Sequence, residues 1–265
     1  MPDVSTSVTM SSFDSALVGL SFLIAVFGAW CGLSCAARAA RSSGSSTGGW
    51  LAAAAAALGG GTFWSMHFIG MLAYHGSVVY RLKVAGTALS FALAIGAALL
   101  GVAVASRVRG WLGCVVGGLV LGGGASFVHF TAMSAMKMNA TTSYRGSTVA
   151  LSVAIAVVSA ILALTLTLKV RRAWGPTVAS LVLGAGVCGM FYVAMLALTV
   201  TPRVTGVDLD LAKHGADPFS LAMPVFGITA VLLFVLLFTG IFGARQDGPA
   251  PEPAPVAEPE PEPAV

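Results

Sequence analysis

The chain alternates between long apolar runs and short polar segments. Seven runs contain no Lys, Arg, Asp or Glu, and they cover residues 15–37, 42–80, 84–106, 110–136, 146–168, 173–202 and 219–244. Each run exceeds the roughly 20 residues that a helix needs to cross the hydrocarbon core of a bilayer. Because backbone groups in lipid must find their hydrogen bonds internally, we expect these runs to be helices. The pattern predicts an all-α membrane protein with seven transmembrane helices.

The composition agrees with a membrane environment. Apolar residues make up 57% of the 265 residues, and only 9% are charged. A water-soluble fold of this size could not bury that much apolar surface. The formal net charge of +4 comes from cations near the ends of the apolar runs, so it gives no reason to expect nucleic acid binding. The expected surroundings are a lipid bilayer.

The distribution of Lys and Arg predicts the orientation of the helices. The segments after the first, third, fifth and seventh runs contain Arg38, Arg41, Arg107, Arg109, Lys169, Arg171, Arg172 and Arg245. The segments at the opposite ends contain Arg81, Lys83, Lys137, Arg145, Arg203 and Lys213, with the acids Asp208, Asp210 and Asp217. Because cations close to helix ends favour the cytoplasmic side, we expect the N-terminus outside and the C-terminus in the cytoplasm, across a bacterial cytoplasmic membrane.

Three parts of the chain differ in composition. We expect residues 1–14 to form a short outer segment and residues 15–244 to form the membrane domain. Residues 245–265 are rich in Pro and Glu. Such a segment cannot bury a core, so we expect a disordered cytoplasmic tail, with no catalytic domain after the membrane part. The tail is a candidate docking segment for a cytoplasmic signalling partner.

One motif recurs with a period of 62 residues, at residues 60–71, 122–133 and 184–195. Each copy begins with a glycine and ends with a methionine, and His67 and His129 keep the same interval. A fixed period of this length marks a repeated structural unit. We predict three helical hairpins in parallel order, each with the motif near the outer end of its second helix, and one extra helix after them.

The motif contains candidate metal ligands. His67 and Met71 are four residues apart, as are His129 and Met133, so each pair shares one face of a helix. Methionines commonly fill gaps in helical bundles, but polar groups inside a membrane are costly and are usually functional. Thioethers and imidazoles together favour Cu(I) over hard cations. We therefore predict a copper site, Cu(I) or Cu(II), where the motif helices face one another.

The predicted ligand set extends beyond these two pairs. It comprises His67, Met71, His129, Met133, Met66, Met190, Met195, Met136 and His75. His75 follows Met71 by four residues and is a candidate third nitrogen at the outer rim, although an interfacial histidine without a ligand role fits its position as well.

The motif resembles that of the MHYT family, which is named for a Met-His-Tyr-Thr signature occurring three times. Residues 66–71 match the first copy, and residues 129–133 match the second with Val128 in place of its Met. In the third copy Phe191 stands where a His is expected. The resemblance covers residues 12–244. It implies a bacterial integral membrane sensor domain that binds copper near the outer face, responds to O2, CO or NO, and often belongs to cyclic-di-GMP signalling proteins.

The loss of one imidazole at Phe191 excludes a site of three motif histidines. A transporter or channel for a small solute or metal ion is an alternative, with the His and Met residues lining its path. A second alternative is a metal-free membrane scaffold that recruits partners through its tail. An enzyme is not expected, because no carboxylate or activated nucleophile occurs within the seven runs.

Overall fold

The structure, a computed structural model, describes residues 12–75, 80–108, 110–138, 140–170 and 174–202, with residues 220, 224, 227–231 and 233–235. Several predictions concern residues outside these ranges. They are the outer segment up to residue 11, the tail 245–265, most of the seventh run, and the charged residues Arg109, Arg171, Arg172, Arg203, Asp208, Asp210, Lys213, Asp217 and Arg245.

Five helices are each long and apolar enough to cross a membrane: α1 (Ser15–Ala39), α4 (Val84–Arg107), α5 (Trp111–Ser134), α6 (Gly146–Lys169) and α7 (Gly175–Leu196). A sixth helical stretch continues without a break through α2 (Ser45–Ala55), the π-helix η1 (Ala56–Ser65) and α3 (Met66–Ala73). In the seventh run the described residues 227–231 and 233–235 are helical. The protein is therefore a mostly helical, multi-pass membrane protein.

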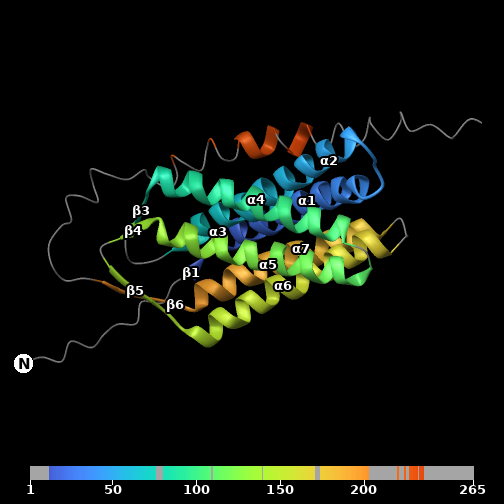
Figure 1. Cartoon of the computed structure of the whole chain (residues 1–265). Helices are drawn as coiled ribbons and strands as arrows, with labels where there is room; N and C mark the ends of the chain where they lie inside the picture. Colours follow the sequence, from blue (N-terminus) through green and yellow to red (C-terminus); the bar gives the residue numbers. More distant parts are fainter. Residues whose placement is uncertain are drawn as a thin grey trace, which may run out of the picture.

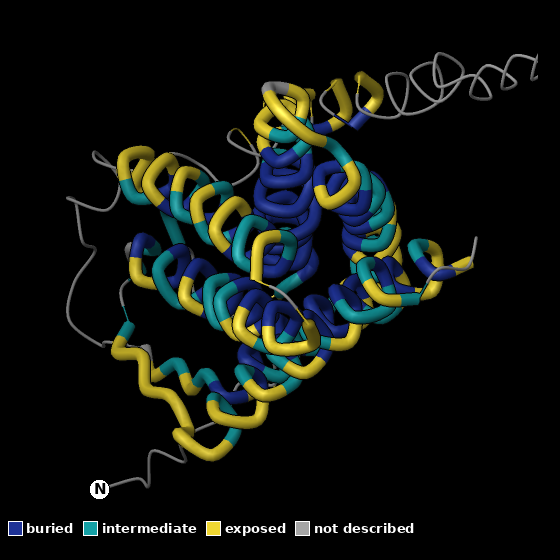
Figure 2. Tube along the Cα trace, turned by 45° about the vertical axis from the view of Figure 1, so that its right-hand side comes forward, coloured by how far each residue is buried: buried dark blue, intermediate teal, exposed yellow. Residues whose placement is uncertain are grey.

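The helices lie alongside one another in a bundle (Figure 1), and their contacts close a ring in chain order. The stretch α2–η1–α3 packs between α1 and α4, α5 packs between α4 and α6, and α7 packs between α6 and α1, which closes the ring. Figure 2 shows the buried residues on the inward sides of the helices and the exposed residues on the outward sides. Many exposed positions are large and apolar; Leu23, for example, is 64% exposed. Such a surface suits contact with lipid rather than water.

Three short antiparallel ribbons add β-structure that the all-α prediction did not include. They pair β1 (Ser12–Phe13) with β2 (Tyr74–His75), β3 (Tyr80–Leu82) with β4 (Met136–Met138), and β5 (Ala140–Tyr144) with β6 (Leu198–Pro202). Each ribbon joins the residues before one helix to the residues that follow the next helical stretch. The pairing gives hydrogen bonds to backbone groups that a helix end leaves without partners.

The ribbons define three units of the same plan, strand–helix–helix–strand, which we call the first unit (12–75), the second unit (80–138) and the third unit (140–202). Next to each ribbon a backbone N–H donates to a carbonyl at the end of the second helix. The three bonds are Asp14 N to Ala73 O at 2.9 Å, Lys83 N to Ala135 O at 3.2 Å, and Arg145 N to Ala197 O at 3.0 Å. The three acceptors are 62 residues apart, the period of the sequence motif.

Small residues let neighbouring helices approach closely. A Cβ atom at Gly122 of α5 would lie 2.5 Å from the carbonyl oxygen of Ala156 in α6. No side chain fits at that distance, so the glycine is needed for the packing of α5 on α6. The close approach brings the motif side chains of the three units together on the axis of the ring.

Candidate metal centre

Three aromatic side chains meet on the axis of the ring, one from each unit. They are His67 of α3, His129 of α5 and Phe191 of α7, at most 5% exposed. Their ring centroids are 5.1 Å apart between the histidines, 5.4 Å between His67 and Phe191, and 5.3 Å between His129 and Phe191. Each pair is nearly perpendicular, with interplanar angles of 80°, 83° and 86°. Phe191 thus occupies the place of a third imidazole.

The two imidazoles lie within hydrogen-bond distance. Their Nδ1 atoms are 3.2 Å apart, so one Nδ1–H donates to the lone pair of the other. Two nitrogens that each lie 2.0–2.1 Å from one tetrahedral ion would be about 3.3 Å apart. The Nε2 atom of His129 is buried and has no hydrogen-bond partner among the described residues. Such an atom is costly in a membrane, which is why buried polar groups usually have a partner or a ligand.

A cavity of about 10 Å³, the size of one water molecule or small ion, adjoins the imidazole pair. Its lining forms three layers, and the three residues of each layer are 62 apart. The layers are Phe63, Ala125 and Val187; Met66, Val128 and Met190; and His67, His129 and Phe191. The donors around the cavity are therefore two imidazoles and two thioethers. This set fits a soft ion such as Cu(I) and lacks the oxygen ligands that hard cations require.

The packing around Phe191 differs from the packing around the histidines. A Cβ atom at Gly70 would lie 2.5 Å from Cε1 of Phe191. The equivalent positions, 62 and 124 residues later, are Ala132 and Ala194. Of the three equivalent residues, the one in the first unit is the smallest, and it faces Phe191, the largest of the three rings.

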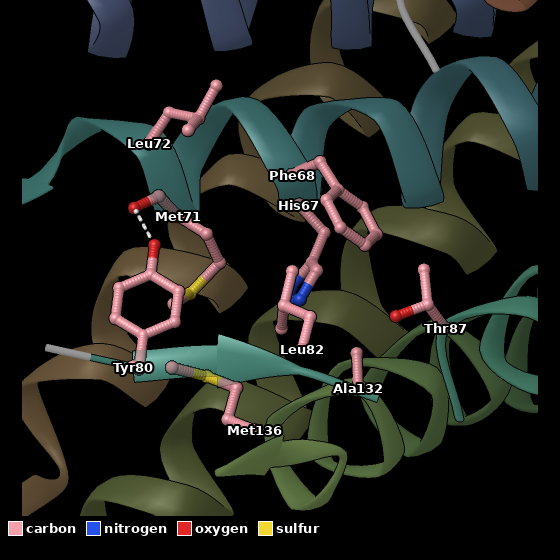
Figure 3. A pocket seen from close by; sticks show the side chains of 9 residues that line it. All are labelled: His67, Phe68, Met71, Leu72, Tyr80, Leu82, Thr87, Ala132 and Met136. Carbon is pink, nitrogen blue, oxygen red and sulfur yellow. Dashed lines mark hydrogen bonds between the residues drawn. The ribbon is translucent and has the colours of Figure 1, made fainter. Parts of the chain in front are cut away.

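The other predicted ligands lie in different places. Met71 and Met136 line a second cavity together with His67 (Figure 3), and the Tyr80 hydroxyl donates to the Met71 carbonyl at 3.2 Å. Met133 and Met195 are buried, but they line neither cavity. His75 lies exposed in β2, where its Nδ1 donates to the Ala73 carbonyl at 3.1 Å, and it lines neither cavity. Within the described ranges no group of three or more His, Cys, Asp or Glu side chains could hold a metal ion.

The π-helix η1 and its contact with the seventh run were not predicted. η1 ends at Ser65, directly before Met66 and His67. The Ser65 hydroxyl lies 2.7 Å from the Gly60 carbonyl, to which it donates, and 2.6 Å from the Thr229 hydroxyl. Leu233 packs with Cys31 and Ala57 nearby. Pure π-helical segments are rare and are often found at functional sites. The only sequence signal is the run of three glycines, residues 59–61.

The fold and the buried imidazole pair define a class, namely helical multi-pass membrane proteins with a candidate site on the bundle axis. The family model of the MHYT repeat, described as "Bacterial signalling protein N terminal repeat", matches residues 60–118 and 122–180. The chain belongs to the MHYT family.

Three curated relatives are named as cyclic di-GMP enzymes or as a signaling protein. The cyclic di-GMP phosphodiesterase NbdA of Pseudomonas aeruginosa is 32% identical over 243 residues, which cover 89% of this chain and 30% of NbdA. The bifunctional diguanylate cyclase/cyclic di-GMP phosphodiesterase MucR of the same organism is 29% identical over 90% of this chain and 35% of MucR. The signaling protein YkoW of Bacillus subtilis is 26% identical over 84% of this chain and 29% of YkoW. The chain thus spans about a third of the length of these relatives. No solved structure matches it.

Proposed function

We propose that this chain is a membrane sensor domain that holds a copper ion between His67 and His129. The observation that carries the proposal is the buried pair of imidazoles, 3.2 Å apart, with a partnerless nitrogen at His129 Nε2 among the described residues. The thioethers of Met66 and Met190 line the same cavity. Bound copper would supply a position at which a small molecule such as O2, CO or NO binds.

The chain's own residues have three tasks in this proposal. The imidazole pair provides two nitrogen donors, and the thioethers of Met66 and Met190 favour the reduced ion. Phe63, Val128, Val187 and Phe191 surround the donors with apolar groups that exclude water. Such a dry shell is one of the features by which proteins tune metal sites. With no carboxylate in the motif helices, we propose that this part of the chain senses and does not catalyse.

We further propose seven membrane spans with three units in parallel order about an axis normal to the membrane. The three equivalent ribbons and the closed ring of helices support this arrangement. The cation distribution favours the ribbon end outside and the Pro/Glu tail in the cytoplasm. Cysteine labelling of Ser77→Cys and Ala250→Cys in intact cells tests the orientation, because only Ser77→Cys should react with an impermeant reagent. Labelling of Ala250→Cys alone would reverse it.

We propose that the signal passes to a cytoplasmic signalling partner or output domain. The similarity to NbdA and MucR, whose names describe cyclic di-GMP enzymes, supports an output of that kind. Within the described residues, η1 links the site to the seventh run through Ser65 and Thr229. Ser65 lies two residues before His67, so this contact joins the neighbourhood of the imidazole pair to the C-terminal region.

The test of the metal site is the copper content of purified protein. We expect about one Cu(I) per chain after loading under reducing conditions, and none in the His67→Ala/His129→Ala double variant. Circular dichroism and thermal unfolding establish that the variant is folded. Equal copper content in a folded double variant would contradict the proposal and leave the two histidines a packing role only.

A further inference from the structure

The second cavity is lined by half-buried residues as well as by His67 (Figure 3). It has a volume of about 10 Å³ and lies between the first and second units, beside the β3–β4 ribbon. Its lining residues Leu72, Tyr80 and Met136 are half-buried, whereas His67 is buried. Because His67 lines the central cavity as well, this side chain lies between the second cavity and the candidate metal centre.

The three unit interfaces differ in the residue that covers them, and this difference coincides with the place of the cavity. Phe13, Leu82 and Tyr144 are equivalent, since each directly precedes the residue whose N–H binds the helix-end carbonyl. Phe13 packs on Tyr192 at 5.3 Å between ring centroids, and Tyr144 packs on Phe130 at 5.7 Å. Leu82 takes the same place against Phe68 of the first unit. Two interfaces are thus covered by an aromatic ring, and the one with a leucine contains the cavity.

The chemistry of the lining indicates what passes through. Met71 and Met136 line the cavity with His67, so its donors include two thioethers and one imidazole. Met136 is 62 residues before Leu198, so the second unit has a thioether where the third has a hydrocarbon side chain. The lining contains no carboxylate. Arg81 is adjacent to Tyr80 and Leu82 in β3, and the alternation of a strand places it on the other face.

We propose that this cavity is the loading route for a soft monovalent metal ion, along which Met136 and Met71 offer thioethers before His67 offers its imidazole. The route rests on the proposed function, because it leads to the same site. Each step exchanges one neutral donor for the next, so no electron is transferred, and an imidazole that binds the ion through Nδ1 carries its proton on Nε2. Leu82 opens the path, because the other two units have an aromatic ring at this position. Met136 supplies a donor within the path, where the third unit has a leucine.

The first experiment measures the rate of Cu(I) loading of the full chain from a weak chelator. We expect Leu82→Phe, which restores the residue type of the first unit, to slow loading by about tenfold or more, equivalent to a barrier higher by at least about 1.4 kcal/mol. Met136→Leu, which restores the residue of the third unit, slows it less because the space stays open. Tyr144→Phe is the matched control, since it keeps an aromatic ring and lies outside both cavities described, and its loading rate should equal that of the wild type.

The second experiment needs no metal. In a background with Cys31, Cys35, Cys114 and Cys188 replaced by Ala, a small methanethiosulfonate reagent should modify Ala132→Cys faster than Ala194→Cys. These positions are equivalent, but Ala132 lines the cavity and Ala194 is fully buried. Leu82→Phe should remove the difference in rate. Equal rates at the two positions would overturn the open cavity and the route with it.

Equilibrium stoichiometry separates the two proposals. A wild-type protein that binds no copper would overturn the proposed function and therefore the route as well. Normal stoichiometry with unchanged loading rates in both Leu82→Phe and Met136→Leu would overturn the route and leave the metal site standing. Slow loading with normal stoichiometry supports the route.

Discussion

The first and third units share one backbone plan but place different chemistry on the axis of the ring. The first unit brings His67 to the axis on a helical stretch that contains a π-helix, and that π-helix contacts the seventh run. The third unit brings Phe191 on α7, which is α-helical throughout. Its neighbour Tyr192 forms a hydrogen-bond contact with Ser21 of α1, with 2.8 Å between the two hydroxyl oxygens.

This difference shows how a repeated fold acquires one asymmetric site. The irregular first unit carries a donor, a cavity at its boundary with the second unit and a link to the C-terminal region. The regular third unit closes the ring with an apolar side chain that is 0% exposed. A few substitutions at equivalent positions, rather than a different fold, therefore separate the proposed sensing side of the bundle from its packing side.

The strongest test of this comparison removes one ring at a time. His67→Ala and His129→Ala should each weaken Cu(I) binding by more than about 100-fold, because even residues outside the coordination sphere of a metal contribute 10–100-fold. Phe191→Leu should leave the affinity within about threefold of wild type, or about 0.7 kcal/mol. Competition with a Cu(I) chelator measures all three. A large loss in Phe191→Leu with intact folding would show that the third unit shapes the site directly.

A smaller effect is expected from rebuilding the symmetry. Phe191→His should tighten Cu(I) binding by about tenfold, or about 1.4 kcal/mol, since a third imidazole then reaches the axis. Gly70→Ala should destabilise the wild type by about 1–3 kcal/mol, the usual cost of overpacking, because its Cβ would lie 2.5 Å from Phe191. In the Phe191→His background that cost should fall. A double-mutant cycle on the free energy of unfolding measures the coupling, and strictly additive effects would contradict the steric explanation.

The 62-residue period was sufficient to predict which side chains share the axis, because equivalent residues of equivalent units occupy equivalent places. His67, His129 and Phe191 meet as that reasoning implies. Pairing by helical spacing was less informative about the thioethers. It favoured Met71 and Met133 as partners of the histidines, whereas Met66 and Met190 line the central cavity. A ligand role for any of these residues remains a prediction.

Other features lay beyond the sequence reasoning for identifiable reasons. The ribbons are two to five residues long, although the run of Thr and Val residues at 199–201 is a β-strand signal that was open to detection. The equivalence of Phe13 with Leu82 was hidden because those two positions are 69 residues apart, not 62. The π-helix packs against the seventh run, and local propensity does not report such contacts.

The thioethers of the central cavity give an effect of similar size. Met66→Leu and Met190→Leu should each weaken Cu(I) binding by about tenfold, or about 1.4 kcal/mol, because leucine keeps the volume and removes the soft donor. Met195→Leu is the matched control, since Met195 is equally buried but lines neither cavity. Competition with a Cu(I) chelator measures the affinity of all three variants. A loss of affinity in Met195→Leu equal to that in Met66→Leu would indicate that the site lies nearer the ribbons.

The smallest effect concerns the contact that distinguishes the first unit from the third, between Ser65 of η1 and Thr229 of the seventh run. Thr229→Val keeps the shape of the side chain and removes the hydroxyl that lies 2.6 Å from Ser65. Hydrogen bonds between membrane helices contribute on average about 0.6 kcal/mol and at most about 1.7 kcal/mol, so we expect a loss of stability in that range. Ser152→Ala is the control, because the Ser152 hydroxyl donates within its own helix to Val149 at 2.7 Å. Thermal unfolding of both variants in the same detergent gives the difference, and equal losses would show that the η1 contact adds nothing beyond an ordinary buried hydroxyl.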